Sequence, residues 1–210
     1  MRTPIADSPE RFESRWIAHC GPQPEGPFGS QRALVEAILA QECALMRFAQ
    51  VRPFSVAQVA KLRLRSSPGG AEHEVFLPPF KRAVSGARVF KITKSPRWGL
   101  KTATPLEYLR RMQRLSDDAG VDVKVEGIAC EDNTPKLVTS MDYVVGVHPS
   151  SGQLHDLLSA MGWDTAYDPD GLLAYKHKES GTLMRDAHPK NLILTPTGKL
   201  VPIDVIFTDL

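Results

Sequence analysis

Cysteine is scarce in this chain, and no stretch is apolar enough to cross a membrane. The 210 residues include three cysteines, Cys20, Cys43 and Cys130, which are far apart and odd in number. Such a set is not a disulfide framework, so we expect a protein of the reducing cytoplasm. No segment approaches the roughly 20 consecutive apolar residues that span a bilayer. The N-terminus carries charges where a signal peptide has an apolar core, so we expect no membrane partner.

The chain also lacks an excess of charge of one sign. Its 26 Lys and Arg residues face 24 Asp and Glu residues, which leaves a net charge of +2. No overall field therefore favours nucleic acid or an anionic membrane. Basic runs at 61–65 (KLRLR) and 109–114 (LRRMQR) are local and typical of a solvated helix face. A zinc site is also not expected, because nothing completes a four-ligand spacing around the His19-Cys20 pair.

Hydrophobic periodicity predicts an α+β fold. Helices are expected near residues 9–18, from Ser30 to shortly before Pro53, from Ser55, over 104–120 and over 151–163; strands are expected at 72–77, 87–93, 121–129, 135–144 and in the alternating remainder. The helix at 104–120 has Thr104 as a cap, Pro105 at its first position and Gly120 at its exit. Its apolar residues recur every three positions, which predicts one buried face.

The sequence MRDAHPKNLILTPTGKLVPID, residues 184–204, carries the residues with the clearest chemistry. Asp186 is followed five residues later by Asn191, and Asp204 comes thirteen residues after that, beyond a short hairpin. Magnesium prefers hard oxygen ligands, usually one or two carboxylates beside phosphate oxygens. Phosphoryl transfer from ATP requires a bound metal, an oriented hydroxyl and neutralised phosphate charge. These three side chains suit that chemistry.

This segment resembles the protein-kinase-like superfamily. Residues 185–191 (RDAHPKN) look like its catalytic loop, and Ile203-Asp204-Val205 looks like its metal-binding motif. The resemblance implies that Asp186 is the catalytic base and that Asn191 and Asp204 bind Mg²⁺. His188 gives the D-x-H-x-x-N pattern of the aminoglycoside and choline phosphotransferases; it orients the loop or serves only in packing.

Upstream segments extend the resemblance. In ARVFKIT, Lys91 is implied to hold the α- and β-phosphates of ATP; the alternative is a strand lysine that faces solvent. The segment SSPGGAEHEVFL stands where the family has its glycine-rich lid, so Gly69 and Gly70 are implied to approach phosphate. His73 is a candidate phosphate donor, and a plain turn is the alternative for Glu72 and His73.

Glu107 has two possible roles. The resemblance implies a helix glutamate paired with Lys91, whereas Thr104-Pro105-Leu106-Glu107 is also a capping box. The sequence leaves both open. Backbone groups around Met141 and Tyr143 are implied to bind adenine, since 137–146 stands where the family has its hinge.

The chain resembles most closely the kinase domain of polyvalent proteins from phages and mobile elements. That resemblance implies an N-lobe sheet with a C-helix at 66–145 and a much reduced C-lobe with the catalytic-loop hairpin at 146–210, since six residues follow Asp204. Residues 1–65 are expected to form a helical N-terminal extension. The expected activity is Mg²⁺- and ATP-dependent phosphate transfer to a hydroxyl of a protein or small molecule.

Two other functions remain open. The adjacent glycines of the lid and the short C-lobe favour a pseudokinase that binds nucleotide or a partner without turnover. An α+β protein that binds nucleic acid through its basic helices is the second alternative, and the low net charge opposes it.

Overall fold

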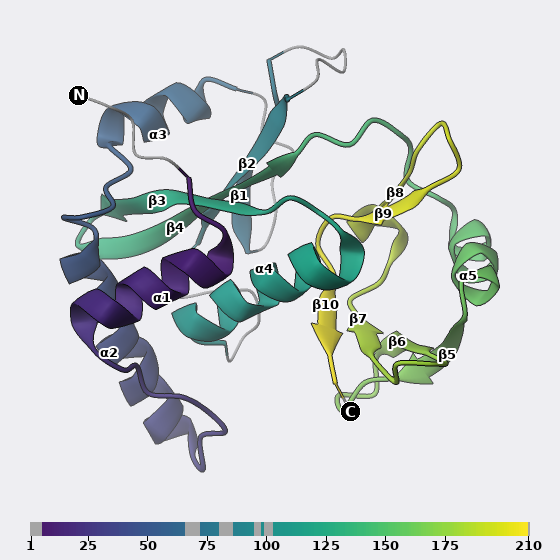
Figure 1. Cartoon of the computed structure of the whole chain (residues 1–210), viewed down its shortest axis with the longest axis horizontal. Helices are drawn as coiled ribbons and strands as arrows, with labels where there is room; N and C mark the ends of the chain where they lie inside the picture. The colour runs from purple at the N-terminus through teal and green to yellow at the C-terminus, as the bar shows by residue number, and fades with distance from the viewer. Residues whose placement is uncertain (1–5, 66–71, 80–85, 95–97, 99–102, 210) are drawn as a thin grey trace. The chain divides into compact units, whose positions relative to one another are not determined.

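The computed structural model describes residues 6–65, 72–79, 86–94, 98 and 103–209 and has an α+β architecture with antiparallel sheets (Figure 1). It forms two compact units. Unit 1 comprises residues 1–113 and 123–143, and unit 2 comprises residues 114–122 and 144–210. The helix α4 (Pro105–Ala119) contributes its first part to unit 1 and its last turns to unit 2.

Unit 1 is built on a four-stranded antiparallel sheet with the order β1-β2-β4-β3. Its elements are α1 (Pro9–Cys20), α2 (Gln31–Phe48), α3 (Val56–Arg63), β1 (His73–Phe76), β2 (Arg88–Thr93), β3 (Lys124–Glu131) and β4 (Thr134–Asp142). In this sheet Lys91 stands between Val75 and Thr139. Because side chains alternate along a strand, the neighbouring Ile92 faces the other side, in a core cluster that includes Leu62 of α3.

The helices of residues 6–63 are packed into unit 1. Phe12 and Trp16 of α1 have no exposed surface, and Phe12 meets Phe48 of α2 edge to face at 5.3 Å between ring centroids. Asp7 and Arg52 form a buried ion pair at 3.0 Å. The segment expected as an N-terminal extension is therefore part of the same compact unit as the sheet.

Unit 2 contains a second four-stranded antiparallel sheet, with the order β10-β7-β6-β5, and a separate hairpin of β8 and β9. Its elements are α5 (Ser151–Ala160), β5 (Trp163–Tyr167), β6 (Leu173–His177), β7 (Leu183–Arg185), the 3₁₀ turn η1 (Pro189–Asn191), β8 (Leu192–Leu194), β9 (Leu200–Pro202) and β10 (Ile206–Thr208). Ser150 caps α5 in a reciprocal capping box with Gln153. The helix ends before the expected residue 163, because Gly162 turns the chain with φ +86°.

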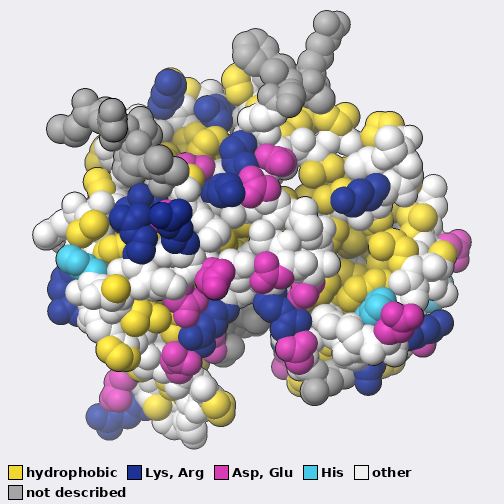
Figure 2. Space-filling view, viewed as in Figure 1, with side chains coloured by type: hydrophobic (Ala, Val, Ile, Leu, Met, Phe, Trp, Pro, Cys, Tyr) yellow, Lys and Arg dark blue, Asp and Glu magenta, His cyan; other side chains and the backbone are white. Residues whose placement is uncertain are grey.

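The buried face of α4 confirms the periodicity seen in the sequence. Leu106, Leu109, Met112 and Leu115 are each almost completely buried. None of the helices in the described part of the chain is long and apolar enough to span a membrane. On the face drawn in Figure 2, charges of both signs are interspersed and no large area carries one sign.

Candidate functional site

Asp186 follows β7 directly and has a left-handed backbone conformation, with φ +53°. This conformation costs a residue other than glycine roughly 1–2 kcal/mol. The preceding Arg185 is fixed by Asp168, whose carboxylate accepts from the guanidinium Nε at 3.0 Å. Strained backbone of this kind concentrates at functional sites, where the surrounding contacts maintain it.

The Asn191 side chain binds both the backbone and the side chain of Asp186. Its amide Nδ2 donates to the Asp186 carbonyl oxygen at 2.9 Å and to the carboxylate Oδ2 at 2.9 Å. Since both partners are acceptors, the amide group at this position must be the NH₂, and the oxygen Oδ1 is turned to the other side. The side chain thus holds the Asp186 carboxylate in place and keeps an acceptor oxygen for a cation.

The hairpin β8–β9 pairs the residues that follow Asn191 with those that precede Asp204. Leu192 pairs with Pro202, and the ladder continues one step, because the Ile203 amide donates to the Asn191 carbonyl at 2.8 Å. Asp204 is the next residue and is partly buried. Asp186, Asn191 and Asp204, which the sequence selected by spacing, therefore belong to one loop-and-hairpin arrangement within unit 2.

Two histidines lie against this loop. His188 Nε2 is 3.6 Å from Asp186 Oδ1, so a protonated imidazole at this position would form an ion pair with the carboxylate. His148 Nδ1 is 3.1 Å from the Pro189 carbonyl and 2.9 Å from the Leu192 carbonyl. Because both are acceptors, this nitrogen carries the proton and donates. Sequence reasoning missed His148, since nothing in its local pattern indicates a contact 41 residues away.

The donor set of the loop fits magnesium better than a transition metal. It offers two carboxylates and one amide oxygen, which are hard ligands. Within the described residues, no group of three or more His, Cys, Asp or Glu side chains lies close enough together to hold a metal ion. A Mg²⁺ site does not require three such side chains, because Mg²⁺ commonly binds one or two carboxylates and completes its coordination shell with phosphate oxygens and water.

In unit 1, Lys91 is buried in β2, with 6% of its surface exposed. The solvent-facing alternative for this lysine is therefore wrong. An ammonium group at such a depth requires compensation by polar or charged neighbours. The role of Lys91 as a phosphate ligand stays a prediction.

Glu107 forms the capping box. Its Oε2 accepts from the Thr104 amide at 2.6 Å, and the Thr104 hydroxyl accepts from the Glu107 amide at 3.2 Å. Local geometry favours this result, since a carboxylate three residues away reaches the helix start without any long-range folding. The carboxylate oxygen Oε2 is therefore engaged at the start of α4, and pairing of Glu107 with Lys91 stays a prediction.

The following residues of α4 link the helix to the sheet instead. The Tyr108 hydroxyl lies 3.1 Å from His73 Nε2 and 3.2 Å from Thr139 Oγ1, and all three side chains are buried. One turn later, Arg111 forms an ion pair with Glu72 at 3.3 Å. His73 is thus an interior residue, and its proposed contact with phosphate stays a prediction. Sequence reasoning missed Tyr108 and Arg111, because their partners depend on the strand register.

The remaining candidates concern the nucleotide. Gly69 and Gly70 lie outside the described residues. Met141 is buried in β4 opposite Val89, and the Tyr143 amide donates to the Ala87 carbonyl at 2.8 Å. Binding of adenine at Met141 and Tyr143 stays a prediction.

Comparison with known proteins returned no relative. No family model, no curated protein and no solved structure matches the chain.

Proposed function

We propose that unit 2 carries the phosphoryl-transfer site of a Mg²⁺- and ATP-dependent phosphotransferase, which acts on a hydroxyl group of a protein or small molecule. The observation that carries this proposal is the position of Asn191. Its NH₂ group binds both the backbone and the carboxylate of Asp186, while its own carbonyl binds the residue before Asp204.

Each side chain has a distinct task in this proposal. Asp186, held by Asn191 and beside His188, accepts the proton of the attacking hydroxyl group. The Asn191 amide oxygen and the Asp204 carboxylate would hold Mg²⁺. A bound Mg²⁺ ion neutralises the charge that develops on the phosphate oxygens. The Asn191 side chain cannot rotate without breaking two hydrogen bonds. Its amide oxygen therefore keeps its position relative to the Asp186 carboxylate.

The order of parts along the chain also supports this function. Protein kinases place a lysine on a strand, then a helix, then a catalytic loop with Asp and Asn, and then a metal-binding Asp. Here Lys91 lies on β2, the helix α4 follows, and Asp186, Asn191 and Asp204 come in that order. A scaffold that only binds a partner has no chemical need for all three oxygen donors.

Thermal unfolding with and without Mg²⁺-ATP tests the proposal. A ligand at 100 times its dissociation constant stabilises the native state by about 2.7 kcal/mol, so the parent protein should gain roughly this amount. Asp204→Ala should lose the gain, because it removes a metal ligand. Asp156→Asn, an exposed residue of α5, is the matched control and should behave like the parent protein. Absence of stabilisation in the parent protein would contradict the proposal.

Turnover separates the enzyme from a nucleotide-binding module. Formation of ADP should fall by about 10²–10⁴-fold in Asp186→Asn, since this change removes the base. The variant should still be stabilised by Mg²⁺-ATP. If the parent protein is stabilised but forms no ADP and labels no acceptor, the pseudokinase function replaces the one proposed.

A further inference from the structure

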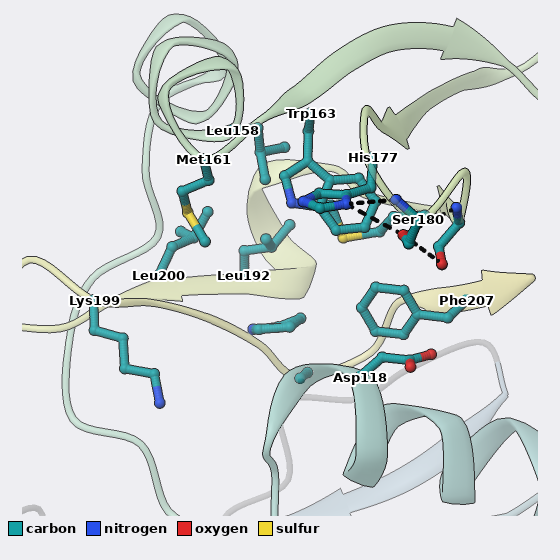
Figure 3. Close-up of a pocket in the computed structure, with 14 residues that line it drawn as sticks. Asp118, Leu158, Met161, Trp163, His177, Ser180, Leu192, Lys199, Leu200 and Phe207 are labelled. Carbon is teal, nitrogen blue, oxygen red and sulfur yellow. Dashed lines mark hydrogen bonds between the residues drawn. The ribbon is translucent and has the colours of Figure 1, made fainter.

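Unit 2 contains a cavity that has no role in the function proposed above. Its volume is about 430 Å³, within the roughly 300–1,000 Å³ of small-molecule pockets. Every residue that lines it belongs to unit 2. In Figure 3, Leu158, Met161, Leu192 and Leu200 lie on one side of this cavity, and Phe207 lies on the other.

The cavity is separate from the proposed phosphoryl-transfer site. Leu192 and Pro202, a cross-strand pair of the hairpin, line the cavity, whereas Asp186, Asn191 and Asp204 are not among its lining residues. In the sequence, Asn191 directly precedes this hairpin and Asp204 follows it, whereas Asp186 follows β7. A ligand in the cavity would contact the strands that carry the catalytic loop and would leave the loop itself accessible.

Most of the residues that line the cavity are apolar or aromatic. The Trp163 ring meets His177 at 4.9 Å and Phe207 at 6.2 Å between centroids. The polar groups of the adjacent turn are directed to one another: the Ser180 amide donates to His177 Nδ1 at 3.3 Å, and the Ser180 hydroxyl donates to Thr182 Oγ1 at 2.9 Å. The Ser180 amide and hydroxyl therefore have partners within the turn. A flat apolar group fits such an interior.

One cation at the cavity remains available. The Asp118 carboxylate accepts from Arg114 Nε at 2.7 Å, and Arg114 also binds Asp209 at 2.6 Å, so these charges are engaged. Lys199 lines the cavity and is exposed. Among the described residues, its ammonium group has no hydrogen-bond or ion-pair partner. An apolar interior with an available cation at its edge matches a ligand with an apolar body and one negative charge.

We infer that this cavity is a binding site for a small aromatic carboxylate. The ring of the ligand lies against Trp163, Leu158 and Phe207, and its carboxylate lies at Lys199. The inference does not depend on phosphate transfer, because the residues that would perform the transfer are outside the cavity.

Methionine methyl NMR tests this inference with naphthalene-2-carboxylate as the probe. Met161 and Met184 line the cavity, whereas Met46 and Met112 belong to unit 1. Titration should shift the methyl signals of Met161 and Met184 in a saturable way and leave unchanged those of Met46, Met112 and Met141, the described methionines of unit 1. Met161→Leu and Met184→Leu assign the two signals.

Two comparisons test the ligand class. Naphthalene-2-carboxamide is a neutral analogue of the same shape. It should bind about two- to fivefold more weakly, because this ratio of dissociation constants corresponds to the free energy of one exposed ion pair. Lys199→Gln should remove this difference. Ala119→Leu extends a side chain into the cavity and should abolish the shifts, whereas Ala119→Ser should retain them.

Three results would overturn the inference. Absence of saturable shifts in the parent protein excludes a binding site in the cavity. Equal affinity for the carboxylate and the carboxamide, unchanged in Lys199→Gln, excludes the carboxylate as the recognised group. Retained shifts in Ala119→Leu would show that the probe binds elsewhere.

Discussion

Removal of the Tyr108 hydroxyl should destabilise unit 1 although it removes a single atom. The hydroxyl has no exposed surface and stands between His73 Nε2 at 3.1 Å and Thr139 Oγ1 at 3.2 Å. Tyr108→Phe removes both hydrogen bonds, and each contributes about 0.5–1.5 kcal/mol to stability. We therefore expect the free energy of unfolding to fall by about 1–3 kcal/mol.

Urea unfolding followed by tryptophan fluorescence measures this loss. Trp16 and Trp98 are completely buried and belong to unit 1, whereas Trp163 belongs to unit 2. A Trp163→Phe background therefore makes the signal specific for unit 1. The midpoint should decrease while the slope with urea is unchanged, since the surface exposed on unfolding is the same.

A double-mutant cycle with Thr139→Val identifies the cause. If the hydroxyl bridges the helix and the sheet, the two changes should couple by about 0.5–1.5 kcal/mol, the net value of one hydrogen bond. A loss below about 0.5 kcal/mol in Tyr108→Phe, with no coupling to Thr139→Val, would refute the argument that Tyr108 links α4 to the sheet.

Three further predictions concern other parts of the chain. Arg63 donates to Glu131 and holds the pKa of this carboxyl below its usual value of 4.5. At pH 7, Arg63→Gln should therefore lower the free energy of unfolding by roughly 0.5–1 kcal/mol. Acid unfolding curves should show this difference shrinking as the pH falls below about 4.5, because protonated Glu131 no longer forms the ion pair. Gly146→Ala places a Cβ 2.3 Å from the Leu194 carbonyl oxygen and should cost about 1–3 kcal/mol in urea unfolding followed by Trp163 fluorescence; wild-type stability would contradict the packing described. Asn191→Ala should slow ADP formation at least tenfold at saturating ATP, and an unchanged rate would show that its two hydrogen bonds do not position the base.

The sequence predicted those features that depend on local patterns. The buried face of α4 and its capping box follow from residues three or four positions apart, and such contacts form wherever the helix forms. The grouping of Asp186 with Asn191 is local in the same sense, because five residues with one tight turn bring the two side chains together. The hairpin that separates Asn191 from Asp204 could also be predicted from its turn residues, and the role of Asp204 as a metal ligand stays a prediction.

Contacts that depend on strand register could not be predicted in this way. The link from Tyr108 to His73 and Thr139 joins α4 to two strands, and a shift of one residue would turn these side chains to the opposite face. His148 contacts the loop that follows β7 across 41 positions of the sequence. The cavity of unit 2 is formed by several elements, and no single segment of the sequence carries a signal for it.

The central claim is that Asp186, Asn191 and Asp204 act together on one metal–nucleotide complex. The most direct measurement is the affinity for Mn²⁺, used in place of Mg²⁺, by electron paramagnetic resonance in the presence of a non-hydrolysable ATP analogue. The parent protein and Asp156→Asn should bind the complex equally, while Asn191→Leu and Asp204→Asn should each bind it at least about tenfold more weakly, the loss expected for one charge-assisted contact. Equal affinity in all four proteins, or no binding in the parent protein, would contradict this account.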